Sequence, residues 1–220
     1  MSEETLQAVK KYYDYISVGN RTKQSVYFVE QHDKMTHLGL FFKEYSASKT
    51  VIFTKSKKTA DSVGVFLREQ GFSVSVAHGN HRASQIEEVA NAYNSNEIDI
   101  LVTTTKIYES MELTEVKMIL SYDLPQEEES YFKALRAVDE VGKSILFVSV
   151  EDEGTLERLE LMMKYSIPQE ELEAFTHTSL PKGISSKKDI IKKPRHKKVQ
   201  QRADKKAAMK AKWGKKEESN

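Results

Sequence analysis

The sequence predicts an α/β fold in which helices cover both faces of a parallel sheet. Six short segments rich in β-branched and aromatic residues alternate along the chain with longer segments of helical periodicity. Several of the short segments are almost continuously apolar, as expected for strands that are buried on both faces. Strands that alternate with helices in this way form βαβ units with right-handed crossovers, which gives a doubly wound sheet.

The strand candidates are runs of apolar residues that end at polar or turn-forming residues. They are Ser25–Val29, Val51–Thr54, Ser73–Ala77, Ile98–Thr103, Val116–Ser121 and Ser144–Val150. The helix candidates fill the intervals: Asp33–Tyr45, Thr59–Gln70, Ala83–Tyr93, Glu127–Val138 and Glu151–Tyr165. Asp33 is expected to cap the first of these helices, and Gly71 is the kind of residue that ends the second.

The charge distribution divides the chain into an acidic body and a basic tail. Residues 176–220 hold 15 Lys and Arg but only 4 Asp and Glu, a net charge of +11, so residues 1–175 carry −10 of the total of +1. We therefore expect an N-terminal helix over 1–22, a folded domain over 23–175, and a disordered Lys-rich tail over 176–220. The N-terminal helix is amphipathic and either docks on the domain edge or binds a partner.

Composition and motifs exclude several classes of chemistry. The chain has no cysteine, which excludes disulfides and thiol nucleophiles, and no apolar run long enough for a signal peptide or a membrane span. We therefore expect a cytoplasmic protein with no membrane partner. The octet Ala137–Ser144 matches a relaxed phosphate-binding loop, but a predicted helix precedes it and a strand follows, the reverse of the required order. His78 and His81 have no acidic or Cys neighbour in sequence, so no metal site is expected.

Six stretches in order resemble the C-terminal RecA-like domain of DEAD-box RNA helicases, a superfamily 2 family. They read KQSVYFVE (23–30), TVIFTKSKKTAD (50–61), FLREQGFSVSVAHGN (66–80), EIDILVTTT (97–105), MILSYDLP (118–125) and ESYF (129–132). The resemblance implies a RecA-like fold over residues 23–175. It also implies contacts to the RNA sugar–phosphate backbone at Ser56, Gly79 and Thr104, with Lys57 and Lys58 beside Ser56.

The chain departs from the family where the resemblance would place ATP chemistry. Thr105 stands at the Asp of motif V, and Glu109, Ser110, Met111 and Glu112 replace its Arg-Gly-Leu-Asp. Ala134, Ala137 and Glu140 replace the three arginines of motif VI. With no partner domain in the sequence supplying a phosphate-binding loop, we expect no catalytic residues, no cofactor and no ATP hydrolysis by this chain alone, although a residual ATPase remains a minor alternative.

The basic tail supplies the remaining candidate RNA contacts. Lysines that neutralise phosphates release counterions, and the single tryptophan could stack on a base. The tail candidates are Lys187, Lys188, Lys192, Lys193, Arg195, Lys197, Lys198, Arg202, Lys205, Lys206, Lys210, Lys212 and Trp213. A purely solubilising tail and a membrane-surface tail are the alternatives for this segment. The leading hypothesis is a non-catalytic RNA-binding protein, and the alternative is a module that docks on a separate helicase N-terminal-type domain or another protein.

Overall fold

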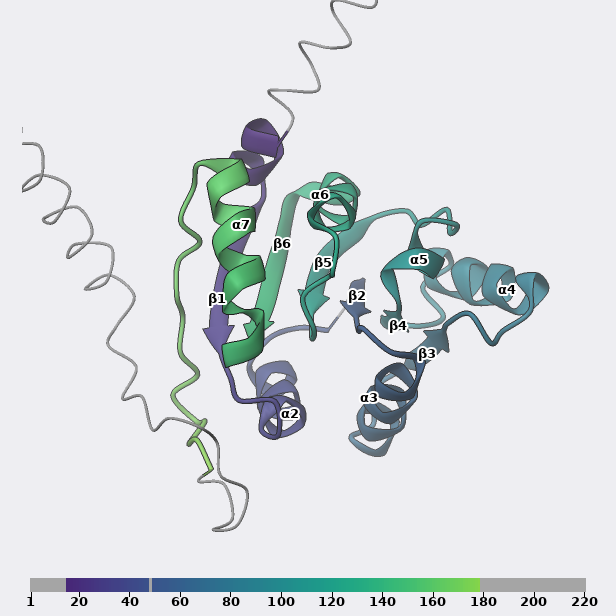
Figure 1. Cartoon of the computed structure of the whole chain (residues 1–220). Helices are drawn as coiled ribbons and strands as arrows, with labels where there is room; N and C mark the ends of the chain where they lie inside the picture. Colours follow the sequence, from purple (N-terminus) through teal and green to yellow (C-terminus); the bar gives the residue numbers. More distant parts are fainter. Residues whose placement is uncertain (1–14, 48, 179–220) are drawn as a thin grey trace, which may run out of the picture. The chain divides into compact units, whose positions relative to one another are not determined.

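Six parallel strands form one sheet in the computed structural model, which describes residues 15–47 and 49–178 (Figure 1). The strand order is β1-β6-β5-β2-β4-β3. The strands are β1 (Lys23–Phe28), β2 (Thr50–Phe53), β3 (Val74–Ala77), β4 (Ile100–Thr103), β5 (Val116–Ser121) and β6 (Val138–Val148). The predicted RecA-like, doubly wound parallel sheet is therefore confirmed.

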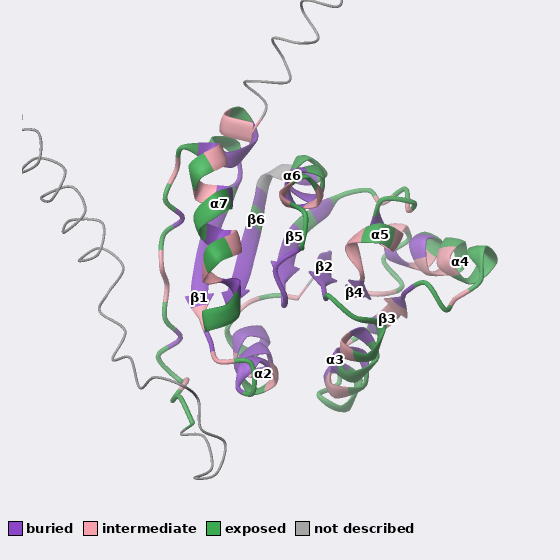
Figure 2. Cartoon of the chain, in the orientation of Figure 1, coloured by how far each residue is buried: buried purple, intermediate pink, exposed green. Residues whose placement is uncertain are grey.

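Helices cover both faces of this sheet. On one face lie α2 (Lys34–Glu44) and α3 (Lys57–Glu69), which pack Leu38, Phe41 and Leu67 against strand residues such as Ile52. The other face carries α4 (Ala83–Asn94), the short α5 (Thr105–Tyr108), α6 (Glu128–Arg136) and α7 (Glu153–Met163), with the 3-10 turn η1 (Val150–Asp152) before α7. Figure 2 shows the result, with buried strands between helices whose outer faces are exposed.

Neighbouring residues of each central strand point into different cores. In β2, Val51 belongs to the core beneath α4–α7, whereas Ile52 belongs to the core beneath α2 and α3, and both are fully buried. The same alternation explains why these strands are apolar at every position, because neither face meets water. Fully burying one such side chain contributes roughly 1.5–3 kcal/mol.

The start of β6 differs from the sequence prediction. The predicted strand began at Ser144 after a turn at Gly142, but β6 begins at Val138 and α6 already ends at Arg136. Pairing with β5 jumps from Val116↔Val138 to Met118↔Lys143, so a bulge absorbs the intervening residues of β6. The polar residues of this bulge masked the strand in the sequence pattern.

The segment that follows α7, residues 166–178, runs beside the edge strand β1 and is called here the C-terminal strap (Figure 1). The Val26 N–H donates to the Pro168 carbonyl at 2.9 Å, and the Glu170 N–H donates to the Val26 carbonyl at 2.9 Å. The Glu170 carboxylate accepts hydrogen bonds from Ser25 Oγ (2.7 Å) and the Tyr27 hydroxyl (2.8 Å). The strap therefore occupies the outer edge of β1.

The strap ends at Asp33, which precedes α2. The Thr178 N–H donates to Asp33 Oδ2 at 3.0 Å, and the Thr178 hydroxyl donates to Asp33 Oδ1. Asp33 occupies the predicted cap position of α2, but its side chain makes no cap hydrogen bond. The prediction that its carboxylate caps the helix is wrong, because both of its oxygens accept hydrogen bonds from Thr178.

Two further predictions concern parts of the chain with little or no description. Most of the predicted N-terminal helix lies outside the described residues, and residues 15–21 are helical. The described residues include no helix with both the length and the apolar character needed to cross a bilayer.

Candidate nucleic-acid interface

Three of the predicted RNA contacts follow the carboxyl ends of three adjacent strands. Ser56 follows β2, Gly79 follows β3 and Thr104 follows β4, and the sheet order places β2, β4 and β3 side by side. In open parallel sheets, ligands bind outside the carboxyl ends of the strands. The topology thus brings these residues, which are distant in sequence, to one edge, called here the β2-β4-β3 edge.

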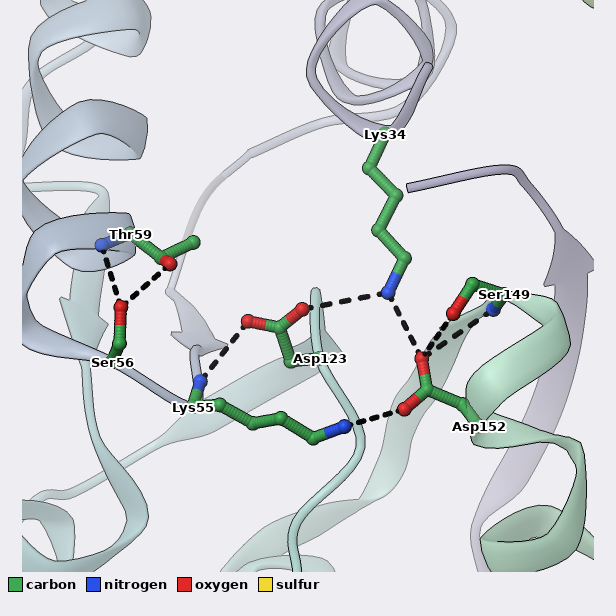
Figure 3. A network of polar contacts seen from close by, with 7 residues as sticks. All are labelled: Lys34, Lys55, Ser56, Thr59, Asp123, Ser149 and Asp152. Carbon is green, nitrogen blue, oxygen red and sulfur yellow. Dashed lines mark hydrogen bonds and ion pairs between the residues drawn. The ribbon is translucent and has the colours of Figure 1, made fainter. Parts of the chain in front are cut away.

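Ser56 is the N-cap of α3. Its Oγ accepts a hydrogen bond from the Thr59 N–H at 3.0 Å and lies 2.8 Å from Thr59 Oγ1 (Figure 3). Ser56, Lys57 and Lys58 are all exposed, so the first turn of α3 presents cations beside the positive end of the helix dipole. The sequence missed the capping role of Ser56, although a Ser followed three residues later by Thr is a usable cap signal.

Lys57 and Gly79 lie together across the gap between α3 and β3. Lys57 Nζ donates to Asn80 Oδ1 at 2.6 Å, and a side chain added at Gly79 would meet Lys57 Cε at 3.4 Å. His78 ties the same turn to α3, because its Nε2 lies 2.9 Å from Asp61 Oδ1. The Gly79 turn is therefore held against the start of α3 by two polar contacts.

Thr104 lies between these two elements in the sheet. Its carbonyl accepts hydrogen bonds from the N–H groups of Ile107 and Tyr108, both at 3.0 Å, and its side chain makes no cap hydrogen bond to α5. The Thr54 N–H donates to the Thr103 carbonyl at 3.0 Å, which fixes the end of β2 to the end of β4. The Thr104 hydroxyl thus sits at the β2-β4-β3 edge, half-exposed.

A network of buried charges lies behind Ser56, and the sequence did not reveal it (Figure 3). Lys34 of α2 is fully buried, and its Nζ lies 3.2 Å from Asp152 Oδ2 and 3.5 Å from Asp123 Oδ1. Asp123 also accepts the Lys55 N–H at 3.0 Å, and Asp152 accepts Lys55 Nζ at 2.6 Å. Two lysines and two carboxylates balance one another, which is the condition under which buried charges are tolerated.

The network lowers the pKa of Asp152. Burial disfavours its carboxylate form, but the hydrogen bond from Lys55, the charge and hydrogen bond of Lys34 and the hydrogen bond from Ser149 outweigh that effect, so the pKa lies below the ordinary 3.8. Asp152 is therefore ionised at neutral pH and keeps the Lys55 ammonium close to it. The Lys55 charge is consequently paired within the protein, unlike the free attractor that the sequence suggested.

Positions that replace the family's charged motif residues contact one another. Glu109 Oε2 lies 3.2 Å from Lys133 Nζ, and Glu109 Oε1 accepts from Ser130 Oγ at 3.1 Å. Ala134 is buried in the core of α6, and Ala137 is the exposed residue that ends this helix. The Arg21 guanidinium caps the end of α6 by donating to the carbonyls of Leu135 and Val138, both at 3.2 Å.

The described residues contain no group of three His, Cys, Asp or Glu side chains that could hold a metal ion. The His78 and His81 rings lie 4.3 Å apart, and His81 Nδ1 accepts the His78 N–H at 3.1 Å, so both rings serve the turn. The octet Ala137–Ser144 runs from the end of α6 into β6, the order expected from the sequence. Every tail candidate, from Lys187 to Trp213, lies outside the described residues.

Comparison with known proteins identifies the domain. The family model for the helicase conserved C-terminal domain matches residues 30–137. An ATP-dependent rRNA helicase of Gibberella zeae is 28% identical over 160 residues, covering 69% of this chain and 33% of that protein. An ATP-dependent RNA helicase of Yarrowia lipolytica is 29% identical over 161 residues, covering 72% of this chain and 38% of that protein. The chain thus spans little more than a third of the length of these curated relatives.

Solved structures agree on the fold. A DEAD box protein of Methanococcus jannaschii superposes with a TM-score of 0.65 at 23% identity, covering 78% of this chain and 49% of that chain. The C-terminal domain of the DEAD-box protein Dbp5 superposes with a TM-score of 0.64 at 20% identity, covering 68% of this chain and 89% of that chain. The described body of this chain therefore belongs to the helicase conserved C-terminal domain family, in the RecA-like form found in DEAD-box proteins.

Proposed function

We propose that this protein binds RNA through its sugar–phosphate backbone and does not hydrolyse ATP by itself. The basic tail supplies most of the affinity, and the β2-β4-β3 edge orients the RNA. The observation that carries the proposal is the convergence of Ser56, Gly79 and Thr104 at the carboxyl ends of three adjacent strands, within a domain of a helicase family. Relatives named as RNA helicases support RNA as the ligand, and a role in RNA remodelling or ribosome-related complexes follows by analogy.

The chemistry of the edge suits phosphate oxygens. Hydroxyls at Ser56 and Thr104 and the backbone N–H groups beside Gly79 are donors that position a nucleic-acid backbone without reading its bases. Lys57 and Lys58 add positive charge at the first turn of α3. The edge alone carries few cations, since Lys55 is paired with Asp152, so a body of net charge −10 needs the +11 tail for tight binding.

The absence of ATP hydrolysis rests on the replaced arginines. An arginine that stabilises the transferred phosphoryl group is worth roughly 10³–10⁵ in rate. Ala134 is buried and Ala137 has no charge to offer, and Glu109 stands paired with Lys133 where the family has an arginine. ATP turnover that requires RNA and disappears in Lys143→Ala would contradict this part of the proposal, because Lys143 lies in the loop-like octet.

Salt-dependent RNA binding tests the proposal. We expect the affinity of the full chain to fall steeply with salt, and the slope to decrease by about 0.7 for each phosphate contact that is removed from a single strand. Replacing Lys57 and Lys58 by Gln should lower the slope, whereas the matched pair Lys43→Gln and Lys117→Gln, also exposed but away from the edge, should not. An unchanged affinity after loss of residues 176–220 would refute the role of the tail.

A second candidate function is docking on another protein. Solved structures of DEAD-box proteins that superpose on this fold include SrmB bound to a regulator of ribonuclease activity and the Dbp5 C-terminal domain bound to Gle1. The same RecA-like body could therefore dock on a helicase N-terminal-type domain or another chain. Affinity capture followed by nuclease treatment separates the two functions: partners that remain after nuclease favour docking, and partners that are lost favour RNA binding.

A further inference from the structure

The C-terminal strap determines where the basic tail begins. It runs parallel to β1 and therefore carries the chain from the end of α7, at the amino-terminal edge of the sheet, to the carboxyl edge. There Thr178 is bonded to Asp33 through both its N–H and its hydroxyl. Residue 179 follows by one peptide bond, so the tail leaves the body at the same edge of the sheet as Ser56, Gly79 and Thr104.

We propose that Glu170 and Asp33 are positioning residues that start the basic tail at the carboxyl edge, so that the tail and the β2-β4-β3 edge engage one RNA strand together. The inference rests on the proposed function and adds a geometric requirement to it. Binding of the second site then becomes intramolecular, and its strength depends on the length of chain between the two sites.

The distances are short enough for this arrangement. The sheet order puts β2 three strands and β3 five strands away from β1, which at the usual strand spacing is about 14 Å and about 24 Å. Lys187 and Lys188, the first lysine pair of the tail, follow Thr178 by nine and ten residues. Nine extended residues reach about 30 Å, so a strand of RNA lying on the edge is within range of this pair.

The anchors of the strap are specific and hold it at both ends. Glu170 is fixed by Ser25 and Tyr27 of β1, and Leu172 is buried in the core beneath α2. Asp33 is itself 2% exposed and spends both carboxylate oxygens on Thr178, when its position would allow it to cap α2. An acidic side chain that leaves its own helix uncapped in order to bind the last residue of the strap is well suited to a positioning role.

Inserting flexible Gly-Ser residues between Thr178 and Ser179 of the full chain tests the inference without touching the strap. The effective concentration of a tethered site falls roughly as the −3/2 power of tether length. Doubling the nine-residue tether to Lys187 should weaken binding of a fluorescent oligouridylate about threefold, and quadrupling it about eightfold. The matched control places the same insertions after Lys216, beyond the candidate contacts, where the affinity should stay constant.

Asp33→Ala tests the anchor itself. Freed from Asp33, the tether would start near Leu172 and lengthen from nine to 15 residues, which should weaken binding about twofold. Because the Asp33 side chain does not cap α2, the fold should persist, and urea unfolding of the same sample checks this. RNA binding that ignores insertion length overturns the inference and leaves the proposed function standing. A full chain that binds no RNA overturns both.

Discussion

Replacing Asp152 by Asn should strongly destabilise the body, because this carboxylate holds two lysines at once. Its oxygens lie 3.2 Å from Lys34 Nζ and 2.6 Å from Lys55 Nζ, and Asp152 is 2% exposed. Lys34 is fully buried, so the substitution leaves its ammonium with only Asp123, at 3.5 Å. The amide of Asn has nearly the same size as the carboxylate, so the change removes charge without creating a cavity.

Removing one partner of a buried ion pair costs about 3–5 kcal/mol, because the other charge stays buried without full compensation. Since Asp123 still faces Lys34, we expect the lower end of that range, about 3 kcal/mol. With a urea m-value of about 2 kcal/mol per molar, the unfolding midpoint should fall by about 1.5 M.

The matched control is Glu109→Gln. Glu109 and Lys133 also lie 3.2 Å apart, but both side chains are more than a third exposed, so the loss should stay below about 1 kcal/mol. Urea unfolding followed by circular dichroism measures both variants. If Asp152→Asn costs no more than Glu109→Gln, burial does not strengthen this network and the reasoning is refuted.

Three further predictions concern the stability of the fold. Burial, and next the charge of His177, lower the pKa of His37 to about 4 from the ordinary 6.5, so protons bind the unfolded chain first and stability should fall as pH drops from 6.5 toward 4. His37→Phe should flatten that pH dependence in urea titrations. Arg21→Met should lower the free energy of unfolding by about 1 kcal/mol, because the carbonyls at the end of α6 lose their donor; an unchanged midpoint would contradict the capping role. Gly64→Ala should cost about 1–3 kcal/mol, since its Cβ would lie 2.2 Å from Val76 Cγ2, and a calorimetric Tm equal to that of the parent would show that α3 and β3 can separate freely.

The strands could be predicted because their apolar runs are local properties of the sequence. Val116–Ser121 was predicted with its observed bounds, and the other strands differ at their ends. The short helix α5 was missed, because four residues carry too little periodicity to signal a helix. The sheet order, which brings Ser56, Gly79 and Thr104 to one edge, came from the family resemblance rather than from spacing.

The ionic network could not be predicted, because its members are far apart in sequence and each is ordinary on its own. Lys34 opens an amphipathic helix, where a lysine normally faces water, yet it is fully buried. Only the meeting of the β5 and β6 ends supplies Asp123 and Asp152 to neutralise it. The strap was equally hidden, since its backbone pairing with Val26 leaves no pattern in the side chains.

The C-terminal strap also bears on colloidal behaviour. β1 is the last strand of the sheet, and an uncovered edge strand offers unpaired N–H and C=O groups to any other chain. Residues 168–170 occupy that side of Val26 and block the approach of a second molecule. A protein shortened before Ser166 should therefore aggregate through β1, whereas one shortened after Thr178 should stay monodisperse.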